Sequence, residues 1–202
     1  AVVMDESMNV IGRGITNSRS NYDTAAAIAK QEALVNSRFH LFREKLGSTQ
    51  ALPSAGPLPS SATPSGGGDR ERAPGGQVHG ALDGFIAQLE RDFRSEQYLE
   101  QLADLEVTCE RSLATARFGE GAAAVGPALT EVFRRLTAEA PTLFAPGAKR
   151  KSDFFRDIAG SQYLATGEAV AKSMDLRYDF LLNLFDRSII EVENRVYGDS
   201  MQ

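Results

Sequence analysis

The chain has 202 residues, of which 42% are hydrophobic and 24% charged, an ordinary composition for a globular protein with one core or two small ones. Its net charge of −5 argues against nucleic acid as the main partner, because phosphate binding normally requires a basic face. The sequence contains no run of about 18 apolar residues, so we expect no transmembrane segment.

Residues 1–20 are the first segment. Two short apolar runs, at 1–4 and 8–11, lie on either side of a polar turn. This pattern predicts a short β-hairpin. Because an isolated hairpin is only marginally stable in water, an extended arm that lies on a partner is an equal alternative.

Residues 21–47 are predicted to form an amphipathic helix. Ser20 or Asn21 is a suitable cap, alanines fill the first half, and Gly47 ends the helix. Its apolar side repeats with nearly heptad spacing, which is typical of a helix that packs along another helix. That side consists of Ile28, Val35, Phe39, Phe42 and Leu46.

Residues 48–79 have a different composition. Five prolines and three consecutive glycines lie among serine, threonine and alanine, with almost no large apolar side chains. Such a segment cannot bury enough surface to offset the entropy lost on ordering. We therefore predict a flexible, disordered linker.

Residues 80–147 form an acidic segment, with eleven acids and six bases, in which we expect three helices. The first is amphipathic and ends or kinks at Ser95, and the third begins near Pro127, because proline suits the first turn of a helix. A loop after the third helix should bring Leu143 and Phe144 into the core. The apolar side of the first helix consists of Leu82, Phe85, Ile86, Leu89 and Phe93.

Residues 148–202 carry the strongest helical pattern. Ser152 is the predicted cap of one helix, in which Gly160 and Gly167 share a side and allow a neighbouring helix to approach closely. A second amphipathic stretch runs from 174 to 198, either as a separate helix or as a continuation of the first. Its apolar seam consists of Tyr178, Leu182, Phe185, Ile189, Val192 and Val196.

These segments together predict an all-α fold. We expect a helical bundle with a long C-terminal helix or helical pair, a disordered Pro/Gly/Ser linker, and a possible N-terminal hairpin or arm. The single cysteine, Cys109, falls in an apolar helical pattern and cannot form a disulfide within the chain. This favours a buried thiol and an intracellular, reducing compartment, first of all the cytoplasm.

The residues that best support an enzymatic function are carboxylates. The sequence has no Walker loop, no Gly-x-Ser-x-Gly and no paired cysteines. Two aspartate pairs have i, i+4 spacing, so each pair projects from one side of a helix, as Mg²⁺-binding pairs do in all-helical pyrophosphate enzymes. The pairs are Asp153 with Asp157 and Asp175 with Asp179. Neighbouring bases make solvated ion pairs the simpler interpretation, so we expect no metal and no cofactor.

Two further groups of residues are candidates for binding. The only basic cluster, at Lys149, Arg150 and Lys151, could contact phosphate or an acidic partner, although solvation is the simpler interpretation. Aromatic and leucine side chains beside the C-terminal seam could face another protein. These predicted partner-binding residues are Tyr178, Phe180, Leu181 and Leu184.

The sequence therefore predicts a non-catalytic helical scaffold, adaptor or assembly subunit that packs against other chains or against itself. The first alternative is an all-α, Mg²⁺-dependent hydrolase or pyrophosphatase that uses the aspartate pairs. The second alternative is a regulatory module whose N-terminal arm binds a small ligand.

Overall fold

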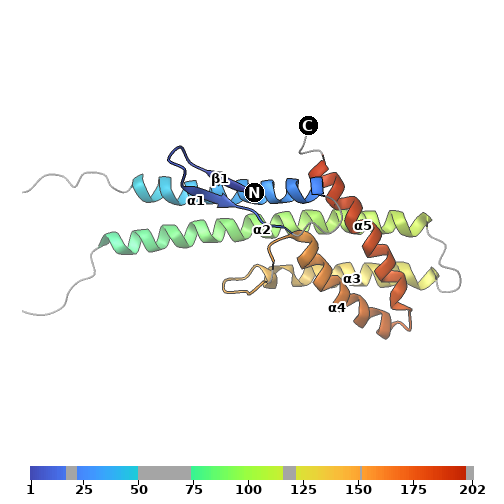
Figure 1. The fold of residues 1–202 in the computed structure, drawn as a ribbon. Coiled ribbons are helices and arrows are strands. Elements are labelled where there is room, and N and C mark those ends of the chain that lie inside the picture. The colour runs from blue at the N-terminus through green and yellow to red at the C-terminus, as the bar shows by residue number, and fades with distance from the viewer. Residues whose placement is uncertain (17–21, 50–73, 116–121, 151, 199–202) are drawn as a thin grey trace, which may run out of the picture.

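The computed structural model describes residues 1–16, 22–49, 74–115, 122–150 and 152–198, and within these ranges it confirms the all-α bundle. Five helices follow a two-stranded antiparallel hairpin (Figure 1). Their bounds are β1 Val2–Met4, β2 Val10–Arg13, α1 Tyr22–Thr49, α2 Pro74–Thr115, α3 Ala122–Leu143, α4 Phe155–Ser173 and α5 Tyr178–Gly198. No helix in the described ranges is long and apolar enough to cross a membrane.

The two longest helices, α1 and α2, run antiparallel along most of the molecule (Figure 1). The second half of α2 packs against α3 and α5, and α4 packs between α3 and α5. The C-terminal end of α1 and the N-terminal end of α2 extend beyond these three helices as a helical hairpin (Figure 1). The molecule therefore has a body, made of α3, α4, α5 and the second half of α2, and a projecting hairpin.

The main core lies in the body, where the apolar sides of four helices meet. Its centre is aromatic: the Tyr163 ring stacks on Phe185 at 4.5 Å between centroids and meets the edge of Phe133 at 5.8 Å. Cys109 is fully buried here, as the sequence predicted. Phe144 is also buried in this core and Leu143 packs against it, as expected, but Leu143 is the last residue of α3 and only Phe144 belongs to the loop that follows.

A second, much smaller core joins α1 to the first half of α2. It contains Val35, Phe39 and Ile86, with Leu82 packed against it. This small core holds the projecting hairpin together, and it is separate from the main core.

The N-terminal β-hairpin packs along α1, so the hairpin alternative is confirmed over the extended arm. Two glycines make the contact possible. A Cβ atom at Gly12 would collide with the carbonyl oxygen of Ala33, and one at Gly14 with that of Ala29. The alanines of α1 present a flat surface, and the strand lies directly on it.

Three helix boundaries differ from the expectation. The kink predicted at Ser95 is wrong, because α2 continues without interruption through this position, where neither proline nor glycine breaks the hydrogen-bond ladder. The third helix begins at Ala122, five residues before Pro127, which lies inside it. The Ser152 hydroxyl accepts a bond from the Phe154 N–H but precedes α4, whose cap residue is Phe154 itself.

The predicted linker lies mostly outside the described residues, which omit 50–73. Its two ends are helical, because residues 48 and 49 belong to α1 and residues 74–79 to α2. The linker prediction is therefore too long at both ends.

The C-terminal segment forms two helices and not one. A short turn between them contains Asp175, whose φ of 50° takes the chain out of the helix. The glycine expectation is confirmed: a Cβ at Gly160 would lie 3.7 Å from the Phe185 ring, and one at Gly167 would lie 3.3 Å from the Tyr178 ring. These two positions let the aromatic side chains of α5 lie against α4.

Candidate interaction surface

The predicted partner-binding residues lie in or against the main core. Leu181 is 0% exposed and Leu184 is 2% exposed, which corrects the expectation that they face another chain. Tyr178 and Phe180 are half-buried and pack against the same core. Periodicity placed these leucines beside the seam correctly, but α5 is surrounded by α2, α3, α4 and the start of α1, so its flanks are covered as well.

The four aspartates of the possible Mg²⁺ site form separate contacts. Asp153 pairs with Arg150 at 2.9 Å, and Asp179 pairs with Arg177 at 2.9 Å on the surface. Asp157 and Asp175 are exposed. Within the described ranges, no three acidic, histidine or cysteine side chains come close enough together to hold a metal ion. The structure therefore does not assemble the two pairs into one site.

The basic cluster is divided by its environment. The Arg150 side chain is mostly covered: it donates a 2.6 Å hydrogen bond to the carbonyl oxygen of Leu143 and lies 4.5 Å over the Phe144 ring. Lys149 is exposed, and Lys151 lies outside the described residues. Arg150 thus fixes the loop between α3 and α4 and is not available as part of a basic patch.

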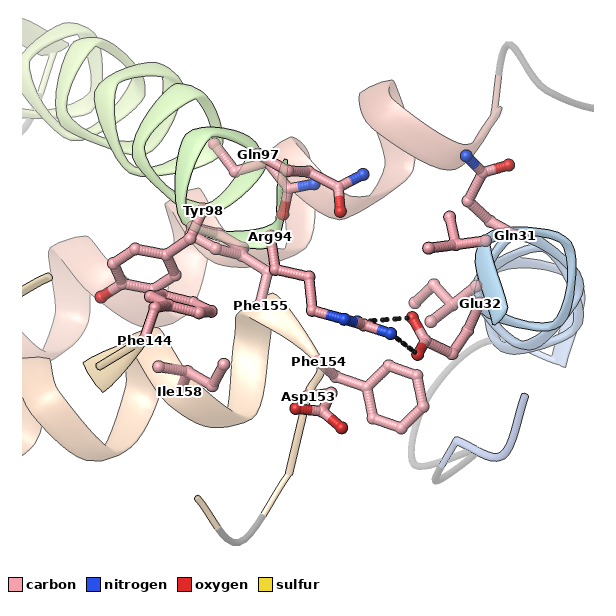
Figure 2. A pocket seen from close by; sticks show the side chains of 13 residues that line it. Gln31, Glu32, Arg94, Gln97, Tyr98, Phe144, Asp153, Phe154, Phe155 and Ile158 are labelled. Carbon is pink, nitrogen blue, oxygen red and sulfur yellow. Dashed lines mark hydrogen bonds and ion pairs between the residues drawn. The ribbon is translucent and has the colours of Figure 1, made fainter. Parts of the chain in front are cut away.

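A polar cavity of about 30 Å³ lies where α1 and α2 meet the start of α4 (Figure 2). Its walls include the polar side chains of Glu32, Arg94 and Asp153 and the rings of Tyr98 and Phe155. This volume has room for about two water molecules. It is too small for a cofactor, and the polar groups that line it include the ion pair that joins α1 to α2.

Arg94 is the centre of this junction. Figure 2 shows its guanidinium reaching from α2 to the carboxylate of Glu32 on α1, at 3.0 Å, and it also donates to the side chain of Asn36 at 2.9 Å. Burial alone would lower the pKa of Arg94, but the hydrogen bond and charge of Glu32 outweigh burial and raise it. The arginine stays charged and sets the register between the two helices, together with an ion pair between Arg43 and Glu90 nearer the hairpin tip.

The projecting hairpin carries a contiguous set of exposed apolar side chains, which we call the hairpin face. Phe42 is 51% exposed and Phe85 is 62% exposed, and both belong to stripes that continue along their helices. The Phe39 ring links the two stripes, because it contacts Phe42 at 6.3 Å and Phe93 at 5.9 Å between centroids. The hairpin face consists of Phe42, Leu46, Phe85, Leu89 and Phe93.

The hairpin face lies on the same side of the hairpin as α5. Positions on a helix that are separated by a whole number of turns project in the same direction. Thr24, about five turns before Phe42 on α1, hydrogen-bonds to Asn194 of α5. Arg111, about five turns after Phe93 on α2, pairs with Glu191 of α5 at 2.9 Å. At the body end, this side of α1 and α2 is therefore covered by α5, and at the hairpin tip nothing in the described chain covers it.

The sequence identified all five residues of the hairpin face as apolar and helical, but it did not predict that they are exposed. Heptad spacing shows which side of a helix is apolar, and it does not show how many neighbouring helices cover that side. A comparison of helix lengths could have located the face. Both α1 and α2 keep their apolar stripes beyond the point at which α3, α4 and α5 can reach them.

The chain matches no protein-family model, and it is similar to none of the curated proteins or solved structures with which it was compared.

Proposed function

We propose that this chain is a non-catalytic helical protein that binds other protein chains through the hairpin face, as a scaffold, adaptor or assembly subunit. The observation that carries the proposal is the exposure of five large apolar side chains in one contiguous area. Exposed apolar areas of this kind typically mark interaction sites, because leaving them in water costs free energy that a partner recovers by covering them.

The surroundings of the face support the same function. Arg94, Glu32, Arg43 and Glu90 hold α1 and α2 in one register, so the face is organised before any partner binds. A preorganised surface loses less conformational entropy on binding than a mobile one. The Mg²⁺-dependent hydrolase and the small-ligand module stay untested predictions.

Site-specific photo-crosslinking tests the proposal. The full chain would carry p-benzoylphenylalanine in place of Phe42 and would be irradiated in an extract of the source cells. Glu44 provides the matched control, because it is exposed on the same helix and lies about 200° around it from Phe42. We expect a protein adduct from position 42 that is absent from position 44. Equal or absent adducts at both positions would contradict the proposal.

A further inference from the structure

The charges along the two edges of the hairpin face indicate which kind of partner the face binds. On α1, Arg38 and Lys45 lie four residues before and three residues after Phe42, so they project beside it. Phe39 and Arg43, on the other flank of Phe42, contact α2. Arg38 and Lys45 therefore form the outer edge of the face on the α1 side, and this edge is basic.

The outer edge on the α2 side is acidic. Asp92 lies three residues after Leu89, and Glu96 lies three residues after Phe93, and both side chains are exposed. On the opposite flank of Phe93, Glu90 and Arg94 face α1. Arg38 and Glu96 form no ion pair with any residue in the part of the chain that the structure describes. An apolar strip thus lies between one basic and one acidic edge.

The same side of the hairpin already holds a helix at the body end. There α5 lies across α1 and α2, and its charges match those of α2: Arg195 pairs with Asp104 at 3.3 Å, and Glu191 pairs with Arg111 at 2.9 Å. The open part of the face, from residue 85 to residue 96 of α2, is about 18 Å long at 1.5 Å per residue, which is about three helical turns. The open part of the face therefore has the length and the charge pattern for a second helix.

A second copy of the chain fits less well. A twofold axis along the hairpin would bring the two copies of α5 together, because α5 lies on the same side as the face. A twofold axis across the hairpin would place Arg38 and Lys45 of one copy against the same bases of the other. A single helix of another protein avoids both the contact between two copies of α5 and the repulsion between like charges.

We infer that the hairpin face binds one amphipathic helix of another protein, which carries acidic side chains along one edge of its apolar stripe and basic side chains along the other. The acidic edge pairs with Arg38, and the basic edge pairs with Glu96. This is the helix-in-groove mode of recognition, in which apolar anchors supply affinity and the flanking charges select the partner. The inference rests on the proposed interaction function and adds the chemistry of the partner.

Three synthetic helical peptides, each long enough to span the open part of the face, test this inference. All three carry leucines at i, i+3, i+4 and i+7 spacing; one has an acidic and a basic edge, one has two acidic edges, and one has two basic edges. Binding to the full chain would be measured by fluorescence anisotropy at low salt. We expect the mixed peptide to bind about threefold to tenfold more tightly than either of the others, since exposed ion pairs contribute only modestly to binding. The preference should decrease at high salt.

Three variants of the chain test whether binding depends on the hairpin face and on the charge beside it. In Arg38→Glu the advantage of the mixed peptide over the fully basic peptide should disappear, and differences in peptide helicity cancel because the same peptides are compared. Phe42→Glu should abolish binding of all three peptides, whereas Glu44→Gln should leave it unchanged.

Several results would overturn the inference. One is that no peptide binds, and another is that Arg38→Glu leaves the ranking of the peptides unchanged. The third is that the mass of the chain doubles with concentration and that Phe42→Glu abolishes this doubling, which would show that a second copy of the chain binds the face. If the position-42 crosslink persists under any of these results, only the inference fails and the proposed interaction function stands.

Discussion

The hydroxyl of Tyr163 on α4 donates a 3.0 Å hydrogen bond to the carbonyl oxygen of Leu181, in the first turn of α5. Both residues are completely buried. The bond crosses the short turn that separates the two C-terminal helices, so it fixes the position at which α5 begins relative to α4. The Tyr163 ring also lies between Phe133 and Phe185, and the same side chain therefore supplies both the aromatic stack and the polar link.

We expect Tyr163→Phe to lower the free energy of unfolding by about 1 to 2 kcal/mol, because it removes one buried hydrogen bond and keeps the ring. Tyr178→Phe is the matched control. Its hydroxyl bonds to the Leu164 carbonyl at 3.3 Å in an exposed position, so its loss should have little effect. Urea denaturation followed by circular dichroism measures both. Equal effects would show that burial of the Tyr163 bond contributes nothing.

A methyl group at Gly14 should displace the β-hairpin from α1. The side chain would meet the main chain of α1 at Ala29, which cannot move without disturbing the helix. We expect Gly14→Ala to cost about 1 to 3 kcal/mol, as overpacking does, and to remove hydrogen-exchange protection from β1 and β2. The control is Gly84→Ala in α2, where a Cβ meets nothing within 4 Å, and where alanine should raise stability. If the amides of the β-hairpin stay protected from hydrogen exchange in Gly14→Ala, this packing is contradicted.

Removing Arg94 should leave Glu32 as a mostly covered, unpaired charge. The Arg94 side chain is 11% exposed and that of Glu32 17%, so we expect Arg94→Met to cost about 2 to 3 kcal/mol, below the 3 to 5 typical of fully buried pairs. The double variant Arg94→Met, Glu32→Met should recover most of this loss, because an apolar pair of similar volume leaves no charge uncompensated. If the double variant is no more stable than the single one, the ion pair is not the source of the effect.

Stability should fall at alkaline pH. Burial raises the pKa of the Cys109 thiol from 9.0 to about 12 and that of the Tyr98 hydroxyl from 10.0 to about 12. A raised pKa means that the folded chain holds these protons more tightly than the unfolded chain. The stabilisation is therefore fully present below about pH 9 and is lost progressively as pH rises toward 12. Thiolate absorbance near 240 nm of the folded chain should show no titration near pH 9. A titration there would place Cys109 in contact with water.

The helices were largely predictable because their signal is local. Periodic apolar residues and end signals located α1 to within two residues at each end and identified the amphipathic stretch that contains α5. The role of Gly160 and Gly167 also followed from spacing alone, since seven residues bring two positions to one side of a helix.

The covering of each apolar stripe was not predictable, because it depends on contacts between segments far apart in the sequence. Leu184 and Phe42 both lie on apolar stripes, yet the first is buried in the main core and the second is half exposed. The role of Gly14 was equally hidden, because it depends on Ala29, which becomes its neighbour only in the folded chain. Such contacts decide which residues form a candidate site, and local pattern carries no information about them.

The separation of the two hydrophobic cores has a consequence for local unfolding. Only Val35, Phe39 and Ile86 are buried in the smaller core, so the projecting hairpin should open as its own cooperative unit, at a free energy well below that of global unfolding. A molecule that binds the hairpin face adds its binding free energy to every opening that disrupts the face, which includes both this local step and global unfolding. We therefore expect backbone amides of residues 35–46 and 85–93 to exchange faster than those of the body in the free chain, and to slow once the face is occupied, whereas body amides that exchange through local openings outside the hairpin keep their rates. Amide exchange would thus report occupancy directly, without any assay of activity.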